Sequence, residues 1–217
     1  MNIEIKDFLK ERLVSQVGFT SCADSPFKNL ENAISLVFRL SDAVVEQIDQ
    51  APTHTYFQHY RTMNAYIDSV LLQLVMFLQE KGFGAAAVPA SQSVSGLAGI
   101  YSHKKAAVCA GLGYIGKSGL FLSGQYGPRV RLGTVFTDAP IETVHMPQKS
   151  QCGTCDLCAR ACGAMAIRNV NFCEGMERED ILDAKACSDF MKEKFQHIGR
   201  GAVCGVCMKV CPKGKRI

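Results

Sequence analysis

Hydrophobic residues recur with helical spacing in two segments of the chain. In residues 3–17 the apolar positions fall every four residues, which predicts an amphipathic helix that Gly18 ends. A second and longer stripe predicts a helix over residues 55–81, closed by two glycines. Its apolar positions are Tyr60, Met63, Ile67, Leu71, Val75 and Leu78. A stripe of this kind is typical of a face packed on a core rather than one in contact with a cofactor.

Short apolar runs between these segments predict buried strands. Residues 33–40 are apolar and partly β-branched, and residues 85–89 follow the long helix as a second short run. Further strands are expected at residues 119–123 and 130–136, and helices at residues 41–50 and 102–110. This mixture of helices and strands predicts an α/β domain over residues 1–145.

The pattern changes after Pro140. Residues 140–150 carry two prolines and read as a connector, and the chain beyond them is rich in cysteine. The sequence therefore predicts a second, small domain over residues 146–217 that contains metal clusters instead of a large hydrophobic core.

Composition places the chain among soluble proteins of a reducing compartment. Its apolar content is 47% and its charged content 20%, as in an ordinary globular protein. The first residues, Met1–Lys6, are charged and do not resemble a signal peptide, and no apolar run approaches the length of a membrane span. We therefore expect a cytoplasmic protein with no membrane contact, in which clustered thiols bind metal or do redox work.

The formal charge of +4 lies in the second domain. Residues 1–144 carry 12 basic and 12 acidic side chains, whereas residues 145–217 carry 12 and 8. Anionic metal clusters would offset this excess, so it gives little support to nucleic-acid binding. The terminal run Lys213–Arg216 is read as a solvated tail, with a phosphate contact as the alternative.

Two cysteine runs carry the strongest chemical signal. The first is Cys152-Gly-Thr-Cys155-Asp-Leu-Cys158-Ala-Arg-Ala-Cys162, and the second is Cys204-Gly-Val-Cys207-Met-Lys-Val-Cys211-Pro212. The spacing C-x2-C-x2-C-x3-C is that of bacterial ferredoxins, in which the fourth cysteine binds the other of two [4Fe–4S] clusters. Structural zinc sites and disulfides are the alternatives, but zinc ligands usually come as C-x2-C pairs.

The ligand count can be closed with one further residue. Two cubane clusters need about eight thiolates, and the runs supply seven, so Cys173 or Cys187 is expected to be the eighth. The crossover rule assigns Cys152, Cys155, Cys158 and Cys211, here the first cysteine group, to one cluster. The second cysteine group is Cys162, Cys187, Cys204 and Cys207. Cys22 and Cys109 are expected to be lone buried side chains.

The segment Gly111-Leu-Gly113-Tyr-Ile-Gly116-Lys117-Ser118 fits two phosphate-binding patterns at once. It matches G-x-G-x-x-G and also G-x-x-x-x-G-K-S. Both patterns need a preceding strand and a following helix, because the helix N-terminus binds the phosphate. Glycines and a proline after Ser118 disfavour a helix, and residues 104–109 favour helix over strand. A glycine-rich turn or a cofactor pocket of another kind is therefore expected.

Several segments together resemble the epoxyqueuosine reductases, which are related to the reductive dehalogenases. They are Ala110-Gly-Leu-Gly-Tyr-Ile-Gly-Lys117, Tyr126-Gly-Pro-Arg-Val-Arg-Leu-Gly133, Thr137-Asp138 and the cysteine order of four, then one, then three. The single central cysteine lies in Leu182-Asp-Ala-Lys-Ala-Cys187, which favours Cys187 over Cys173 as the eighth ligand. The resemblance covers about residues 100–211.

The resemblance implies a nitroreductase-like α/β domain that binds base-off cobalamin close to one of two [4Fe–4S] clusters. The clusters would pass electrons to the cobalt for reduction of a small or nucleoside-like substrate. The residues it places at the cofactor are Gly111, Gly113, Tyr114, Gly116, Lys117, Ser118, Tyr126, Arg129 and Arg131. For Lys117 and the two arginines, exposure to solvent is the alternative.

The sequence departs from the family at its proton donor. The family's aspartate lies upstream of the glycine loop, but here that neighbourhood is Ser95-Gly-Leu97-Ala-Gly99 and contains no acid. Tyr101 and His103 are the candidates in its place. The alternative is that Tyr101 is packed and that His103 is a surface residue. The family's C-terminal helical repeat, which helps bind tRNA, has no counterpart before Ile217.

Three functions follow as hypotheses. The first is a corrinoid-dependent iron–sulfur reductase that receives electrons from a low-potential ferredoxin or flavodoxin. The second is an electron-transfer protein with no substrate of its own. The third is a flavin- or nucleotide-binding module that uses the glycine loop. Charge and length give tRNA little support as a partner.

Overall fold

The computed structural model describes residues 1–21 and 24–214. Cys22 and Lys215–Ile217 lie outside the described residues, and with them the predictions for Cys22 and for most of the basic tail. The described chain divides into two compact units. Unit 1 comprises Met1–Arg39, Met63–Gly113 and Arg131–Gln148, and unit 2 comprises Leu40–Thr62, Tyr114–Val130 and Lys149–Ile217.

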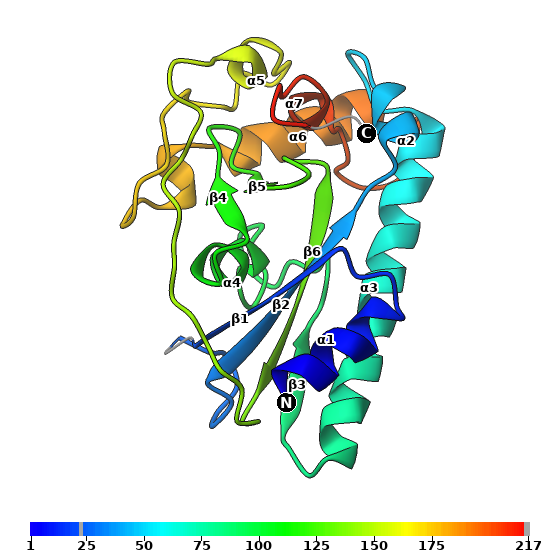
Figure 1. Ribbon diagram of the computed structural model, residues 1–217. Coiled ribbons are helices and arrows are strands. Elements are labelled where there is room, and N and C mark those ends of the chain that lie inside the picture. The colour runs from blue at the N-terminus through cyan, green and yellow to red at the C-terminus, as the bar shows by residue number, and fades with distance from the viewer. Residues whose placement is uncertain (22–23, 215–217) are drawn as a thin grey trace. The chain divides into compact units, whose positions relative to one another are not determined.

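Helices and strands are mixed as far as β6 (Val130–Thr137), and the elements after β6 are all helical (Figure 1). In order they are α1 (Asn2–Lys10), β1 (Gln16–Ser21), β2 (Asn32–Arg39), α2 (Asp42–Glu46), α3 (His54–Glu80), β3 (Ala85–Val88), α4 (His103–Cys109), β4 (Gly113–Ile115), β5 (Phe121–Ser123), β6 (Val130–Thr137), α5 (Leu157–Arg160), a 3-10 turn η1 (Arg178–Asp180), α6 (Ala184–Phe195) and α7 (Val206–Lys209). The mixed α/β fold expected from the sequence is confirmed.

Unit 1 is built on a four-stranded sheet of order β1-β2-β6-β3. β1 pairs antiparallel with β2, with Phe19 opposite Ile34, and β3 pairs antiparallel with β6. Alternate residues of a strand face opposite sides, so Ile34 packs into the core with α1 and α3 while Ala33 packs with α4 on the other side. Helices therefore cover both faces of this sheet.

The long apolar stripe is a core stripe, as predicted. Ile67, Leu71, Leu74 and Leu78 of α3 are fully buried in the core that also holds Ile5. Burying each large apolar side chain stabilises the fold by about 1.5–3 kcal/mol relative to leaving it exposed, so the packing of this stripe on the sheet favours folding. The stripe leaves no role for these side chains in holding a cofactor.

The prediction of one helix over residues 3–17 is wrong beyond Lys10. Leu13, which continued the four-residue spacing, has a positive φ of 53° and is 82% exposed. The Ser15 amide donates to Val37 and begins the pairing of β1 with β2. Gly18 lies inside β1 instead of ending a helix, and a Cβ there would lie 2.8 Å from Ala110 Cβ. Long-range pairing with β2 thus prevails over the local helical pattern.

The predicted boundary at residue 145 does not describe the compact units. It lies close to the last passage from unit 1 to unit 2, between Gln148 and Lys149. Residues 40–62 and 114–130 nevertheless belong to unit 2 with the cysteine-rich segment, here defined as residues 149–214. The chain enters unit 2 three times, and a linear boundary cannot express this.

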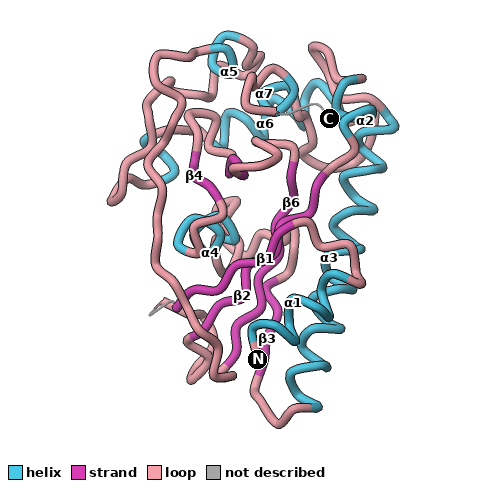
Figure 2. The backbone as a smooth tube through the Cα atoms, in the orientation of Figure 1, coloured by secondary structure: helices cyan, strands magenta, loops and turns pink. Residues whose placement is uncertain are grey.

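The cysteine-rich segment contains little regular structure. Figure 2 shows a long loop between β6 and α5, and α5, η1 and α7 are each four residues or fewer. Seven of its apolar side chains are buried: Ala166, Ile167, Ile181, Phe195, Val203, Val206 and Met208. No helix in the described ranges is long and apolar enough to cross a membrane.

Candidate iron–sulfur site

The glycine segment forms a hairpin and not a phosphate-binding loop. It is preceded by helix α4 and followed by strand β5, which reverses the order that a nucleotide-binding motif needs. β4 and β5 pair in a two-stranded sheet, and the Gly116 amide donates to Leu120 O at 2.9 Å across the turn. Lys117 and Ser118 therefore lie at the tip of the hairpin. Neither phosphate-binding motif is formed, as expected from the glycines and the proline after Ser118.

The tip of the hairpin lines a cavity within unit 2 together with cysteines. All four members of the first cysteine group line this cavity. The other lining residues are Lys117, Ser118, Leu122, Pro212 and Lys213. The structure therefore brings Cys211 of the last cysteine run to the three cysteines of the first run, as the crossover rule requires.

Local structure positions these four cysteines. The Cys155 amide donates to Cys152 O at 3.1 Å, which folds the first run into a tight turn before α5. The Gly214 amide donates to Cys211 O at 3.0 Å at the other end. A Cβ on Gly116 would lie 2.6 Å from Leu122 and 3.3 Å from Cys152 Sγ, so only glycine lets the hairpin approach this sulfur so closely.

Burial and mutual repulsion raise the pKa of the buried thiols. For Cys158 burial is the main cause, and the negative fields of Cys152 and Cys211 add to it. Cys211 responds in the same way to burial and to Cys152 and Cys155. Thiolates that repel one another in a poorly solvated site favour a cationic guest, because metal ligation is what stabilises the deprotonated form.

The second cysteine group shows the same electrostatic grouping. Burial raises the pKa of Cys187 to about 11, with Cys162 and Cys204 as the further causes. Burial also raises the pKa of Cys207, to which Cys204 and Cys187 contribute. The pKa values of Cys187, Cys204 and Cys207 therefore each respond to the charge of other cysteines of this group.

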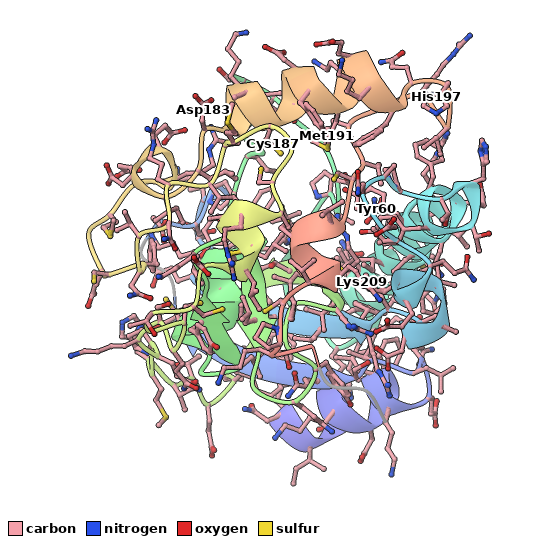
Figure 3. The ribbon with its side chains drawn as sticks, turned by 90° about the horizontal axis from the view of Figure 1, so that it is seen from above. Tyr60, Asp183, Cys187, Met191, His197 and Lys209 are labelled. Atoms are coloured by element: carbon pink, nitrogen blue, oxygen red, sulfur yellow. The ribbon has the colours of Figure 1, made fainter. Side chains whose placement is uncertain are left out.

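Helix α6 presents Cys187 from its first turns. The Asp183 side chain caps the helix by accepting the Ala186 amide, and the Cys187 amide donates to Asp183 O. Cys187 and Met191 stand one helical turn apart and leave the same side of α6, toward α7 (Figure 3). Cys173, the alternative eighth ligand, is exposed, and its sulfur contacts Asn171 O. None of the ten described cysteines forms a disulfide.

A set of ion pairs ties α7 to α2 inside unit 2. Arg129 binds Asp42 at 2.9 Å and Glu46 at 2.6 Å, and Lys209 of α7 also binds Glu46. Burial alone would lower the pKa of Arg129, but the two carboxylates raise it. Figure 3 labels Lys209 on α7, between the cysteines of the last run. The carboxylates of α2 thus hold the last cysteine run in place.

The predicted cofactor residues do not gather around one described site. Arg129 is bound to the carboxylates of α2, and Arg131 donates to Asn64 Oδ1 at 3.0 Å within unit 1. Arg129 is buried and Arg131 is half-buried, so the alternative of exposure to solvent does not hold for either side chain. Tyr114 is buried, and burial together with Cys152 and Cys211 raises its pKa to about 12. Gly111 and Gly113 lie in unit 1, and Tyr126 is partly buried in unit 2.

The two proton-donor candidates are packed into unit 1. Both ring nitrogens of His103 have partners, Thr134 Oγ1 at 2.9 Å and Pro89 O at 3.0 Å. Because a carbonyl can only accept, Nε2 carries the proton and Nδ1 accepts from the Thr134 hydroxyl. Tyr101 packs edge-on against Phe136 with ring centroids 4.9 Å apart. His103 is half-buried and both of its ring nitrogens have partners, so it is not a freely exposed surface residue.

Sequence reasoning missed three residues of the site. Asn169 accepts a hydrogen bond from Lys117, and Asp42 and Glu46 bind Arg129. These residues lie 52, 87 and 83 positions from their partners, and no motif surrounds them. Long-range polar pairs of this kind leave no signal in a single sequence.

Comparisons with known proteins agree with the cysteine pattern. Residues 151–214 match the model of a 4Fe-4S double cluster binding domain. A tetrachloroethene reductive dehalogenase of Desulfitobacterium hafniense is 29% identical over 161 residues, which is 67% of this chain and 27% of that protein. An epoxyqueuosine reductase of Listeria monocytogenes is 30% identical over 112 residues, which is 48% of this chain and 27% of that protein. The chain thus spans about a quarter of the length of either relative.

Solved structures of the same two kinds share the fold. A catabolic reductive dehalogenase in complex with 3-bromo-4-hydroxybenzoic acid aligns with 98% of this chain and 31% of its own, at a TM-score of 0.75 and 19% identity. Epoxyqueuosine reductase from Bacillus subtilis aligns with 99% of this chain and 65% of its own, at a TM-score of 0.67 and 20% identity. The resemblance predicted from the sequence is confirmed: the chain is related in sequence and fold to epoxyqueuosine reductases and reductive dehalogenases, and residues 151–214 match a domain that binds two [4Fe–4S] clusters.

Proposed function

We propose that the chain is an iron–sulfur reductase whose two cysteine groups each hold one [4Fe–4S] cluster. The observation that carries this proposal is the cavity in unit 2 that all four members of the first cysteine group line. These cysteines come from two runs about fifty residues apart, which is the crossed ligation of a two-cluster ferredoxin. The match of residues 151–214 to a double cluster model supports it further.

The residues of the cavity fit a cubane cluster. Four free cysteines surround it, and Gly116 leaves room beside Cys152 that a methyl group would fill. When bound, such a cluster supplies one-electron transfer at low potential. The chain's own contribution is to hold the sulfurs, to exclude water with the buried Leu122, and to place a cation beside them.

The proposal includes a base-off cobalamin as electron acceptor and a small or nucleoside-like substrate. It rests on the resemblance, and a solved reductive dehalogenase of TM-score 0.75 is described in connection with B12-dependent dehalogenation. The contacts of Lys117, Arg129 and Arg131 do not fit a role at a corrinoid, because each side chain is bound within its own unit. We therefore assign no chemical step to that cofactor.

A second candidate is an electron-transfer protein without its own substrate. The segment that carries the family's proton donor, here residues 95–99, contains no acid and is exposed throughout. His103, a replacement candidate, already donates its single proton to Pro89 O. These observations favour a protein that passes electrons from a low-potential ferredoxin or flavodoxin to a partner.

Absorption spectra separate the candidates. Protein purified without oxygen is titrated with cobalamin, and the spectrum is recorded before and after reduction. A shift to the base-off corrinoid spectrum supports the reductase. Iron–sulfur absorption with no corrinoid shift supports the electron-transfer protein, and flavin bands in the purified protein would support the nucleotide-binding alternative. A protein without iron and sulfide would refute both leading candidates.

A further inference from the structure

Lys117 is a buried cation that lines the cavity of the first cysteine group. The residue is 5% exposed, although it stands at the tip of a hairpin, where a lysine usually reaches solvent. It lines the cavity together with all four cysteines of that group. Its position therefore belongs to the cluster site rather than to the surface.

The partner of Lys117 is uncharged. Its Nζ donates to Asn169 Oδ1 at 3.1 Å, and Asn169 is itself exposed with a left-handed φ of 61°. In the described part of the chain Lys117 has no carboxylate within ion-pair distance, whereas Lys209 and Arg129 both bind Glu46. A buried ammonium without a counter-charge is costly, so an anion is expected beside it.

The anion is available in the same cavity. A [4Fe–4S] cluster with four thiolates carries about two negative charges when oxidised and about three when reduced. We propose that Lys117 is the counter-ion of this cluster and raises its reduction potential, with Asn169 holding the ammonium in place. This inference rests on the proposed binding of a cluster by the first cysteine group.

The direction of the effect follows from charge. Reduction adds one electron and no proton, and a fixed positive charge stabilises the more negative, reduced form. Removing the charge therefore lowers the potential. Because the site is poorly solvated, we expect about a tenfold change in the ratio of reduced to oxidised cluster at fixed poise, which is about 59 mV for a one-electron couple.

The second cluster provides an internal reference. Two lysines lie two residues from a ligand of this cluster, Lys185 before Cys187 and Lys209 after Cys207. Both form ion pairs, Lys185 with Asp189 and Lys209 with Glu46. Lys117 has no such carboxylate. One couple of the protein should therefore respond to Lys117 and the other should not.

The test is an anaerobic redox titration with dithionite, followed by EPR, on the full chain with both clusters loaded. Lys117→Met removes the charge with little change in shape. At fixed poise it should lower the ratio of reduced to oxidised cluster about tenfold for one couple, and the other couple should be unchanged. Lys213→Met is the matched control, because Lys213 lines the same cavity but is exposed, and water screens its charge. Its shift should be smaller.

Asn169→Asp tests the same idea without changing the lysine. The new carboxylate would pair with Lys117 and cancel its charge, so the same couple should fall. This variant also decides the matter if Lys117→Met loses the cluster, because Asn169 is exposed and Asp tolerates its backbone conformation.

The outcomes distinguish this inference from the function beneath it. Wild-type protein without two cubane EPR signals would refute the proposed function itself. The role of Lys117 would be overturned if the loaded variants had the reduction potentials of the wild type. It would also be overturned if Lys117→Met and Lys213→Met shifted the potential equally. Loss of one cluster from both Lys117→Met and Asn169→Asp would also overturn it, in favour of a structural role.

Discussion

Unit 1 and the cysteine-rich segment of unit 2 are ordered by different physical means. Unit 1 packs α1, α3 and α4 on a four-stranded sheet, with a core of fully buried side chains such as Ile34 and Leu71. Apart from α6, the cysteine-rich segment has only helices of four residues or fewer. It has seven buried apolar side chains and nine cysteines, eight of them in the two groups. The first region is stabilised by hydrophobic burial, whereas the second depends on ion pairs and on the metal clusters that its cysteines bind.

This difference teaches where metal binding and folding are coupled. A segment with a small core gains its stability from the metal, because the site does not exist in the unfolded chain. A sheet with a continuous core does not need the metal. Removing the clusters should therefore affect the two regions unequally.

The largest expected effect is the loss of order on cluster removal. Treatment with an oxidant and a chelator should abolish amide protection in α5 and α7, while β1 and β2 keep theirs. Hydrogen exchange followed by mass spectrometry measures both regions in one sample. Equal loss of protection in both would contradict the division drawn here.

The next effect is the loss of a single cluster. Cys158→Ser removes a member of the first cysteine group and should abolish one of two clusters, whereas Cys173→Ser should leave the iron content unchanged. Iron and acid-labile sulfide analysis of both variants checks this pair. Iron loss in Cys173→Ser would overturn the assignment of Cys187 as the eighth ligand.

Breaking the ion pairs of α2 should weaken the cysteine-rich segment without touching a ligand. Glu46→Gln leaves Arg129, whose side chain is 3% exposed, with Asp42 alone and deprives Lys209 of its carboxylate. We expect a loss of about 2 kcal/mol, below the value for a fully buried pair because Glu46 is partly exposed.

The control for that variant is an exposed pair. Asp156→Asn breaks the contact with Arg160, whose side chain is 67% exposed, and should cost less than about 1 kcal/mol. Thermal unfolding of the loaded protein compares the two. Equal losses would show that the pairs of α2 are not buried enough to matter.

A core variant should act on unit 1 alone. In Gly133→Ala the added methyl would lie 2.9 Å from Leu71 and 3.0 Å from Ile67, which predicts a destabilisation of about 1 kcal/mol from overpacking. Gly124→Ala is the control, since nothing lies within 4 Å of its Cβ position. Denaturant unfolding measures the cost, and iron content should stay at the wild-type level in both.

The smallest effect is the titration of His103. Burial lowers its pKa below the ordinary value near 6.5, although the hydrogen bond to Pro89 opposes this. The unfolded chain then binds the proton more readily, so the free energy of unfolding is constant above about pH 6.5 and falls as the pH decreases below it. Imidazole NMR with His103→Gln for assignment measures this, and titration at or above pH 6.5 would refute it.

Local signals in the sequence predicted most elements and the cysteine chemistry. The strands over residues 32–39 and 130–137 and the helix over residues 54–80 carry patterns that tertiary contacts reinforce. The cysteine spacing predicted iron–sulfur ligation because the geometry of the cluster fixes the intervals between the cysteines along the chain. The glycine hairpin could be separated from a phosphate loop because a helix could not follow Ser118.

Features that depend on distant partners escaped prediction. β1 was read as the end of a helix because its pairing with β2 is not visible in residues 11–17. The burial of Lys117 could not be foreseen, since Asn169 and the cysteines around it come from other parts of unit 2. Periodicity reports only which face of an element is apolar, and never which element covers it.

The central claim is that two groups of four cysteines hold two [4Fe–4S] clusters. Mössbauer spectroscopy of protein produced with ⁵⁷Fe, combined with metal and sulfide analysis, tests it most directly. The account predicts about eight irons and eight sulfides per chain, all with the parameters of cubane clusters. Zinc in place of iron, or iron in a single mononuclear environment, would contradict it.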